Sequence, residues 1–258
     1  MKVSIITVVL NQKKYIQSSI ESVLNQSYAD LEYIIIDGGS ADGTIDIIKK
    51  YSDKISKYVS EPDQGIYYAM NKGISLATGD IIGFLNADDF YADKSVIQNV
   101  VDVFNKNSVD SCYGDLIYVK RDDISRTTRN WKSGAFSLEK FKKGWFPPHP
   151  TFFVKRDIYN KFGNFNTAFK FSADVELMIR FLCKHNISTY YIPEVLIKMR
   201  DNGESNKNYL NISKSVWECY KALRINGINV TYLYILRTLI FRLRQKVGCL
   251  NQKLLTDN

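Results

Sequence analysis

Apolar runs of strand length alternate with helical segments through the first third of the chain. Residues 3–10, VSIITVVL, are almost continuously β-branched, which is typical of a strand buried on both faces. Strand-like runs recur at residues 31–36, 56–60 and 81–85, and apolar residues at helical spacing fill the segments 15–24, 45–51 and 66–77 between them. This alternation predicts a doubly wound α/β fold built on a parallel sheet.

Acidic residues follow three of these strands. Asp37 and Asp63 come after two of them, and the run at 81–85 leads into the adjacent pair Asp88 and Asp89. Because the carboxyl ends of parallel strands lie at one edge of a sheet, these acids can converge on one ligand. Neighbouring carboxylates repel each other unless a cation or donors lie between them, and magnesium takes carboxylate and phosphate oxygens together. The pair therefore predicts a metal–diphosphate site, with a solvated acidic turn as the alternative.

Four stretches resemble the inverting family 2 glycosyltransferases of GT-A fold. They are VSIITVVLN, YIIIDGGSADGT, EPDQGIYYAMNKGISLATGDIIGFLNADD and FSADVELMIRF, and the resemblance covers about residues 1–205. It is strongest to the non-processive bacterial enzymes that build surface polysaccharides on a lipid carrier. The resemblance implies an α/β fold with a doubly wound, mixed but mostly parallel sheet flanked by helices. We expect a GT-A domain at residues 1–208, with a nucleotide-sugar half at 1–105 and an acceptor half at 106–208, and a basic amphipathic helical extension at 209–258.

The resemblance implies several contacts to the nucleotide sugar. Asp37 and Gly38 end the second strand, where a carboxylate can accept from a uracil N–H or a ribose hydroxyl; the family often has two acids there. Asn11 and Asp63 are further nucleotide-side candidates, and Asn71 lies where the family places a donor contact. The alternatives are that Asp37 only caps the Gly-Gly turn and that Asn71 is a plain helix-surface amide.

The resemblance also assigns the metal site. Asp88 aligns with the family's metal-binding acid, while Asn86 and Ala87 occupy the first two positions of what is usually an acidic triplet. Asn86 can contact a ribose hydroxyl or orient a metal-bound water, and Asp89 binds metal through water or braces the turn. We expect Mn²⁺ or Mg²⁺ to bind with modest affinity, with the donor diphosphate supplying much of the charge. Residues 199–206, MRDNGESN, resemble the family's loop that closes over the diphosphate, with Arg200 or Ser205 as a phosphate contact.

Inverting transfer is a single displacement in which one base takes the proton of the acceptor hydroxyl. In FSADVELMIRF the resemblance gives Asp174 the base position, where the family more often has Glu-Asp and this chain has Ala173-Asp174. Asp174 could instead be a plain helix cap, and Glu176 is the second candidate for the base. Upstream, the proline-rich loop at 144–151 carries Trp145, which can stack on a sugar face.

His149 follows in the same loop, at a place where the family often has a histidine on the acceptor side.

The C-terminal extension is strongly basic. The net charge is +8, and no acidic residue occurs between Glu218 and Asp257. An apolar stripe recurs there every three or four residues, at Leu233, Leu236, Ile240, Leu243, Val247 and Leu250. Such a helix can lie in an anionic membrane interface, pack on the catalytic domain or a second subunit, or bind nucleic acid. The resemblance favours the cytoplasmic membrane surface, contacted through residues 228–250; nucleic acid is not expected, and a homodimer stays open.

The remaining features are consistent with a protein at the inner face of the cell membrane. We see no N-terminal signal peptide and no apolar run near the roughly 18 residues of a membrane span. The four cysteines form no CxxC pair and are expected to be reduced cytosolic thiols.

The sequence therefore predicts an inverting, metal-dependent glycosyltransferase. It would move a hexosyl or N-acetylhexosaminyl group from a UDP-sugar to a lipid-linked saccharide in O-antigen or capsule biosynthesis. One alternative is a nucleotidyltransferase on the same fold, although residues 11–14, NQKK, match the expected glycine-rich loop poorly. Another is a catalytically impaired nucleotide- or membrane-binding module, for which Asn86 and Ala173 leave room.

Overall fold

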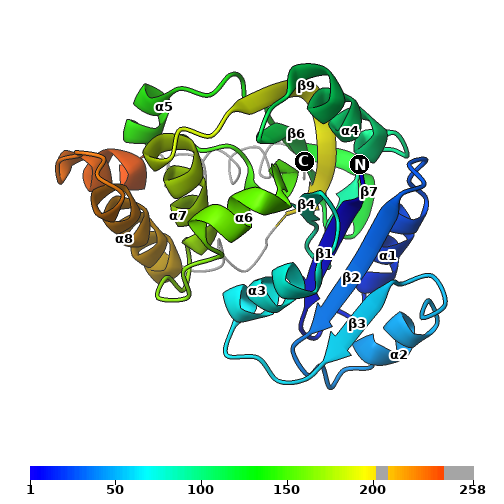
Figure 1. The fold of residues 1–258 in the computed structure, drawn as a ribbon. Helices are drawn as coiled ribbons and strands as arrows, with labels where there is room; N and C mark the ends of the chain where they lie inside the picture. The colour runs from blue at the N-terminus through cyan, green and yellow to red at the C-terminus, as the bar shows by residue number, and fades with distance from the viewer. Residues whose placement is uncertain (202–208, 241–258) are drawn as a thin grey trace.

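A single mixed sheet organises the molecule. The computed structural model describes residues 1–201 and 209–240, and Figure 1 shows their arrangement. Within this part of the chain the strand order is β3-β2-β1-β4-β8-β6-β9-β5, with β7 paired to β6. The strands are β1 (Val3–Val9), β2 (Leu31–Asp37), β3 (Lys57–Ser60), β4 (Ile81–Phe84), β5 (Phe90–Tyr91), β6 (Ser111–Lys120), β7 (Asp123–Trp131), β8 (Phe153–Lys155) and β9 (Thr189–Arg200).

The first half of the sheet is parallel and confirms the predicted α/β alternation. Strands β1 to β4 pair only in parallel among themselves. The helices α1 (Ile16–Leu24), α2 (Thr44–Lys49) and α3 (Ile66–Leu76) connect them, within a few residues of the predicted bounds. The second half mixes directions: β8 runs antiparallel to β4 and β6, whereas β6 and β9 are parallel. Its helices are α4 (Val96–Asn107), α5 (Leu138–Lys142), α6 (Arg156–Phe162) and α7 (Ala173–Ile179).

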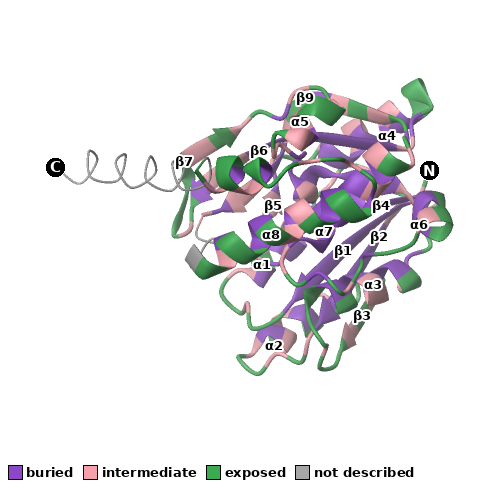
Figure 2. Ribbon diagram, turned by 90° about the vertical axis from the view of Figure 1, so that its left-hand side faces the viewer, coloured by how far each residue is buried: buried purple, intermediate pink, exposed green. Residues whose placement is uncertain are grey.

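The sheet is buried on both faces because side chains alternate along its central strands. In β1, Ile6 and Val8 belong to a core shared with α3, α6 and α7, whereas Val3, Ile5 and Val9 belong to a core shared with α1, α2 and α4. Figure 2 shows β1 and β2 as buried along their length. The ends of these strands are therefore rigid points from which to hold polar side chains.

The C-terminal extension packs in part on the catalytic domain. Helix α8 (Tyr209–Ile225) lies against α7 and buries Cys219, Ala222 and Leu223 in the first core. Residues 233–240 are helical; Tyr234 is buried, whereas Leu233, Leu236 and Ile240 are exposed. Leu243, Val247, Leu250 and Cys249 lie outside the described residues. No helix in the described ranges is long and apolar enough to cross a bilayer.

A buried carboxylate ties the first two strands to the turn before β4. Glu32 of β2 accepts hydrogen bonds from Ser4 Oγ (2.6 Å), Thr78 N (2.7 Å) and Thr78 Oγ1 (2.9 Å), and Lys57 Nζ lies 3.3 Å away. Burial alone would raise the pKa of Glu32, but these hydrogen bonds and the Lys57 charge lower it from 4.5 to about 2. The carboxylate is thus far more stable ionised in the folded protein than in the unfolded chain.

Glu32→Gln should therefore destabilise the protein by about 3 kcal/mol at pH 7. Because the folded pKa is lowered, this stability is present above the unfolded value of 4.5 and is lost as pH falls towards 2. Urea unfolding of both proteins at pH 7, 4 and 3 measures it. The difference between them should shrink steadily with pH; a constant difference would contradict the linkage.

Candidate functional site

Asp37 closes the turn at the end of β2. Its side chain is fully buried and accepts hydrogen bonds from Gly39 N (3.2 Å), Ser40 N (3.0 Å), Ser60 Oγ (2.7 Å) and Ser40 Oγ. The adjacent Gly38 donates its N–H to Val9 O at 2.9 Å, which links the ends of β1 and β2. Asp37 thus has the contacts of a turn cap, and any contact to a nucleotide would be made from this rigid turn.

The exits of β1 and β2 border an open hollow of about 510 Å³. Asn11 has a left-handed backbone (φ 51°) and accepts a hydrogen bond from Ala41 N at 2.9 Å, so it joins the two exit loops. The hollow is lined by Asn11, Gln12, Lys13, Lys14, Tyr15, Asp42 and Ile47. Lys13 and Lys14 bring positive charge to this hollow, beside the Asp42 carboxylate, and Lys14 Nζ pairs with Asp122 at 2.6 Å.

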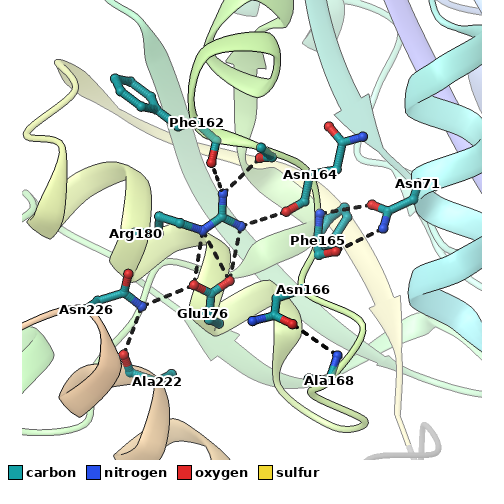
Figure 3. A network of polar contacts seen from close by, with 11 residues as sticks. Asn71, Phe162, Asn164, Phe165, Asn166, Ala168, Glu176, Arg180, Ala222 and Asn226 are labelled. Atoms are coloured by element: carbon teal, nitrogen blue, oxygen red, sulfur yellow. Dashed lines mark hydrogen bonds and ion pairs between the residues drawn. The ribbon is translucent and has the colours of Figure 1, made fainter.

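Two predicted donor-side residues have intramolecular partners. Asp63 pairs with Lys72 Nζ at 2.7 Å, although its Oδ2 is buried without a hydrogen bond. Asn71 of α3 exchanges two hydrogen bonds of 2.9 Å with the backbone N–H and C=O of Phe165 (Figure 3). Asn71 therefore braces the loop before α7, a role beyond that of a plain surface amide.

Asp88 and Asp89 differ sharply in environment. Asp89 is buried and accepts hydrogen bonds from Asn86 Nδ2 (2.9 Å) and Arg200 N (3.1 Å). Burial and the neighbouring charge of Asp88 raise the pKa of Asp89 to about 7. Asp88 is more accessible, and its Oδ2 pairs with Arg121 Nη2 at 2.8 Å. Asp89 thus braces the turn after β4, while Asp88 is the carboxylate presented to a ligand.

Two arginines hold this turn, and sequence reasoning missed one of them. Arg200, at the end of β9, donates from Nη1 to Asp88 O and from Nη2 to Ser18 Oγ (3.1 Å). Arg121, in the β6–β7 turn, stacks over the Tyr15 ring at 4.8 Å and pairs with Asp88. No motif marks Arg121, because the contact spans 33 residues and depends on the path of the hairpin. Arg200 thus holds the backbone of Asp88, whereas Arg121 pairs with its carboxylate.

The donor set at Asp88 fits a hard cation that arrives with a phosphate ligand. Within the described residues no three acidic, histidine or cysteine side chains gather to form a complete metal cage. Magnesium-type ions are commonly held by one or two carboxylates plus substrate phosphates, with water completing the shell. Asp88 can supply such a carboxylate oxygen once Arg121 moves aside or shares it.

Asp174 lies at the start of α7, where two side chains converge on its carboxylate. Tyr67 donates its hydroxyl to Oδ1 at 3.0 Å, and His149 Nδ1 lies 3.0 Å from Oδ2. Burial and the Asp174 charge raise the pKa of Tyr67 well above its usual value, so Tyr67 remains a donor. A cavity of about 20 Å³ adjoins the group, lined by Met70, Phe84, His149, Phe152, Tyr159, Phe165, Asp174, Leu177 and Met178. The structure thus brings together Asp174 and His149, which the sequence marks separately, and adds Tyr67.

Glu176, the second candidate for the base, is the centre of a structural network (Figure 3). It is buried and receives Arg180 Nε at 3.0 Å and Asn226 Nδ2 at 3.1 Å. Arg180 also donates to the backbone carbonyls of Phe162, Gly163 and Asn164. Glu176 therefore fixes α7 to the loop before it and to the end of α8.

Glu176→Gln should destabilise the fold by about 3 kcal/mol, because it leaves the largely buried Arg180 charge without its counter-ion. Urea unfolding at pH 7 measures this. Glu139→Gln is the matched control, since Glu139 pairs with Lys142 at the surface and is 69% exposed. That control should change stability by less than about 0.5 kcal/mol. Equal effects of the two substitutions would contradict the structural role of Glu176.

Trp145 is half-buried among other aromatic side chains. Its ring lies edge-on to Phe141 (5.9 Å between centroids) and Tyr113 (6.4 Å), and Lys140 Nζ sits 4.9 Å from its centroid. A sugar could stack only on the part of the Trp145 ring that Phe141, Tyr113 and Lys140 leave exposed.

Comparisons with known proteins agree with this architecture. The sequence model described as glycosyl transferase family 2 matches residues 4–171. A PGL/p-HBAD biosynthesis glycosyltransferase of Mycobacterium bovis is 30% identical over 205 residues, covering 78% of this chain and 77% of the relative. An uncharacterized glycosyltransferase of Mycobacterium tuberculosis is 32% identical over 181 residues, covering 69% of this chain and 68% of the relative.

Solved structures share the fold at low identity. Residues 1–349 of Staphylococcus aureus TarS, in complex with UDP-GlcNAc, superpose with a TM-score of 0.61 at 16% identity, covering 94% of this chain and 72% of the other. This chain covers 43% of the longer TarS chain. The mannosyltransferase PcManGT of Pyrobaculum calidifontis, in complex with GDP-Man and Mn²⁺, gives 0.64 at 15% identity, with coverage of 99% and 75%.

Proposed function

We propose that this chain, which belongs to glycosyl transferase family 2, is an inverting glycosyltransferase that uses a nucleotide-sugar donor, with uridine diphosphate as the preferred nucleotide. The observation that carries the proposal is the Asp174 group. A carboxylate held by Tyr67 and His149 adjoins a cavity that is also lined by Phe84, the last residue of β4. Asp88 lies in the loop that follows β4. The Asp174 carboxylate is therefore available for the acceptor, and the Asp88 carboxylate for the diphosphate.

With Asp88 at the donor and Asp174 at the acceptor, roles can be proposed for the other site residues. Residues 1–105 form the nucleotide-sugar half, with the base and ribose near Asn11, Asp37, Gly38 and Asp63. Asn86, Ala87 and Asp88 lie at the diphosphate, and Asn71 supports the donor side through the Phe165 loop. Structural neighbours that bind UDP-GlcNAc, or GDP-Man with Mn²⁺, support a donor of this class.

A divalent cation held by Asp88 would neutralise charge on the leaving diphosphate, with Asp89 bracing the turn that presents Asp88. The remaining chemistry belongs to the protein. The acceptor hydroxyl oxygen forms a bond to the anomeric carbon as the bond from that carbon to the diphosphate oxygen breaks. The nucleoside diphosphate leaves with the electron pair, and the hydroxyl proton passes to the Asp174 group. This displacement inverts the anomeric centre.

We further propose a lipid-linked saccharide acceptor, as in assembly of a surface polysaccharide, in the acceptor half at residues 106–208. Trp145 and His149 lie on this side. The exposed Leu233, Leu236 and Ile240, together with the basic residues of the extension, support peripheral contact of residues 228–250 with an anionic, inner-face membrane surface.

The proposal is tested by thermal-shift and calorimetric titration with UDP, GDP, UDP-GlcNAc and GDP-Man, each with and without Mn²⁺. We expect a stabilisation that requires the metal and is larger for UDP than for GDP. Release of nucleoside diphosphate from the sugar nucleotides then measures turnover with water as acceptor. Binding without turnover would favour an impaired nucleotide-binding module, and no response to any nucleotide would overturn the proposal.

A further inference from the structure

We propose that Glu218 of α8 positions Asp174 for the transfer reaction, by holding the stretch of backbone that leads into α7. The inference rests on the proposed function, in which Asp174 takes the proton of the acceptor hydroxyl. Glu218 itself touches no reacting atom, so its role is that of a positioning residue. It gives the C-terminal extension a part in the chemical step.

The start of α7 is not capped by its own side chains. Ser172 occupies the N-cap position, but its side chain makes no capping hydrogen bond. Its Oγ lies instead 2.9 Å from Ser215 Oγ and 3.2 Å from Ser215 O, both in α8. The Asp174 carboxylate is engaged by Tyr67 and His149. Because a helix start usually relies on its own side chains for capping, the backbone here must be held from outside α7.

One carboxylate of α8 holds this backbone. Glu218 accepts three consecutive N–H groups, from Lys170 N at 3.0 Å on Oε1 and from Phe171 N at 2.8 Å and Ser172 N at 2.9 Å on Oε2. Hydrogen bonds to an ionised acceptor are stronger than those between neutral groups. The path of the chain is therefore fixed up to two residues before Asp174.

Two lysines of α8 hold the same stretch through its aromatic rings. Lys214 Nζ lies 5.9 Å from the centroid of the Phe171 ring, and Lys221 Nζ lies 5.7 Å from that of Phe169. Glu218 is the only acidic residue of α8, and these lysines lie about one turn before and after it. Since α8 is itself anchored in the first core and packs on α7, it is a rigid support for this stretch.

The rate of transfer should depend on this support. A base must lie within hydrogen-bond reach of the proton that it takes, and a misplacement of about 1 Å can lower the rate by about 100-fold. The side chain of Asp174 is held by Tyr67 of α3, whereas its backbone is held through Glu218 of α8. The residues proposed for the nucleotide lie at the exits of β1, β2 and β4. Loss of Glu218 should therefore impair the chemical step and spare donor binding.

Glu218→Gln tests this inference. The substitution keeps the size of the side chain but turns an NH₂ group towards N–H donors. We expect kcat for hydrolysis of UDP-GlcNAc or GDP-Man to fall by about 10- to 100-fold, with UDP–Mn²⁺ binding unchanged. Glu32→Gln is the control for loss of stability, because Glu32 contacts Ser4 and Thr78 away from α7 and α8. It should keep the wild-type kcat at a temperature at which all the proteins are folded. An unchanged kcat in Glu218→Gln, or an equal loss in Glu32→Gln, would overturn the proposal.

A double substitution shows whether Glu218 acts through Asp174. In the Asp174→Asn background the base is already lost, so adding Glu218→Gln should lower the residual kcat by less than about twofold. A further loss as large as in the wild-type background would mean that Glu218 acts by another route, and would contradict the positioning role.

Amide hydrogen exchange measures the positioning without turnover. Glu218→Gln should speed exchange in residues 170–176, and Glu32→Gln should not. Exchange in this segment that is the same in the wild type and Glu218→Gln would overturn the proposal, whether or not any donor is hydrolysed. Absence of hydrolysis by the wild type would count against the proposed function, and exchange would then still decide whether Glu218 holds the backbone that leads into α7.

Discussion

Asp88→Ala should abolish the manganese-dependent stabilisation by UDP and reduce donor hydrolysis by about 100-fold or more. Asp88 presents the accessible carboxylate at the β4 exit, whereas Asp89 is buried and engaged by Asn86 and Arg200. The diphosphate would then lose the protein ligand that fixes its counter-ion. Thermal shift and calorimetry with UDP, with and without Mn²⁺, measure the binding, and nucleotide release measures turnover.

Arg121 should allow some UDP binding to remain in Asp88→Ala. In the wild type Arg121 pairs with Asp88 at 2.8 Å, so removing the carboxylate frees a cation beside the diphosphate position. Weak, metal-independent UDP binding should therefore survive in Asp88→Ala. Asp123→Asn is the matched control: it lies in the same hairpin, but its exposed carboxylate accepts hydrogen bonds only from Ser125, from N at 3.2 Å and from Oγ at 2.6 Å. Metal-dependent UDP binding that persists in Asp88→Ala would place the cation elsewhere.

The first half of the fold could be predicted because its elements are local. The β-branched run of β1 and the spacing of Ile16, Ile20 and Val23 in α1 are visible within short windows, and the parallel order follows from their alternation. The second half could not be predicted in this detail, since its pairings join distant segments. Gly83 is an example: a Cβ there would lie 2.4 Å from the Phe153 ring, so its smallness is explained only by the neighbouring strand β8.

In the candidate site, too, the sequence identifies individual residues but not the residues that they contact. Motif positions identify Asp88, Asp174 and His149, but not what they contact. Tyr67 and Asp174 are 107 positions apart, and Arg121 meets Asp88 across 33. These meetings depend on tertiary packing, which a motif does not encode.

Asp174→Asn should lower donor hydrolysis by about 1,000-fold while leaving UDP–Mn²⁺ binding unchanged. The substitution is nearly isosteric. The amide oxygen can still accept from His149 Nδ1, and the amide NH₂ can donate to the Tyr67 oxygen if that hydroxyl turns. The geometry is therefore retained while the carboxylate that takes the proton of the acceptor hydroxyl is lost. Steady-state nucleotide release measures the turnover, and calorimetry with UDP and Mn²⁺ measures the binding.

Tyr67→Phe separates loss of charge from loss of positioning at the same carboxylate. It removes the 3.0 Å hydrogen bond to Oδ1 but leaves the ion and the His149 contact intact, so turnover should fall by only about tenfold. The two substitutions should be far from additive with His149→Gln, because each acts on one proton-transfer unit. If Tyr67→Phe were as damaging as Asp174→Asn with UDP binding preserved, the orientation of the carboxylate would matter more than its charge. If Asp174→Asn kept wild-type turnover, another group would have to take the proton of the acceptor hydroxyl.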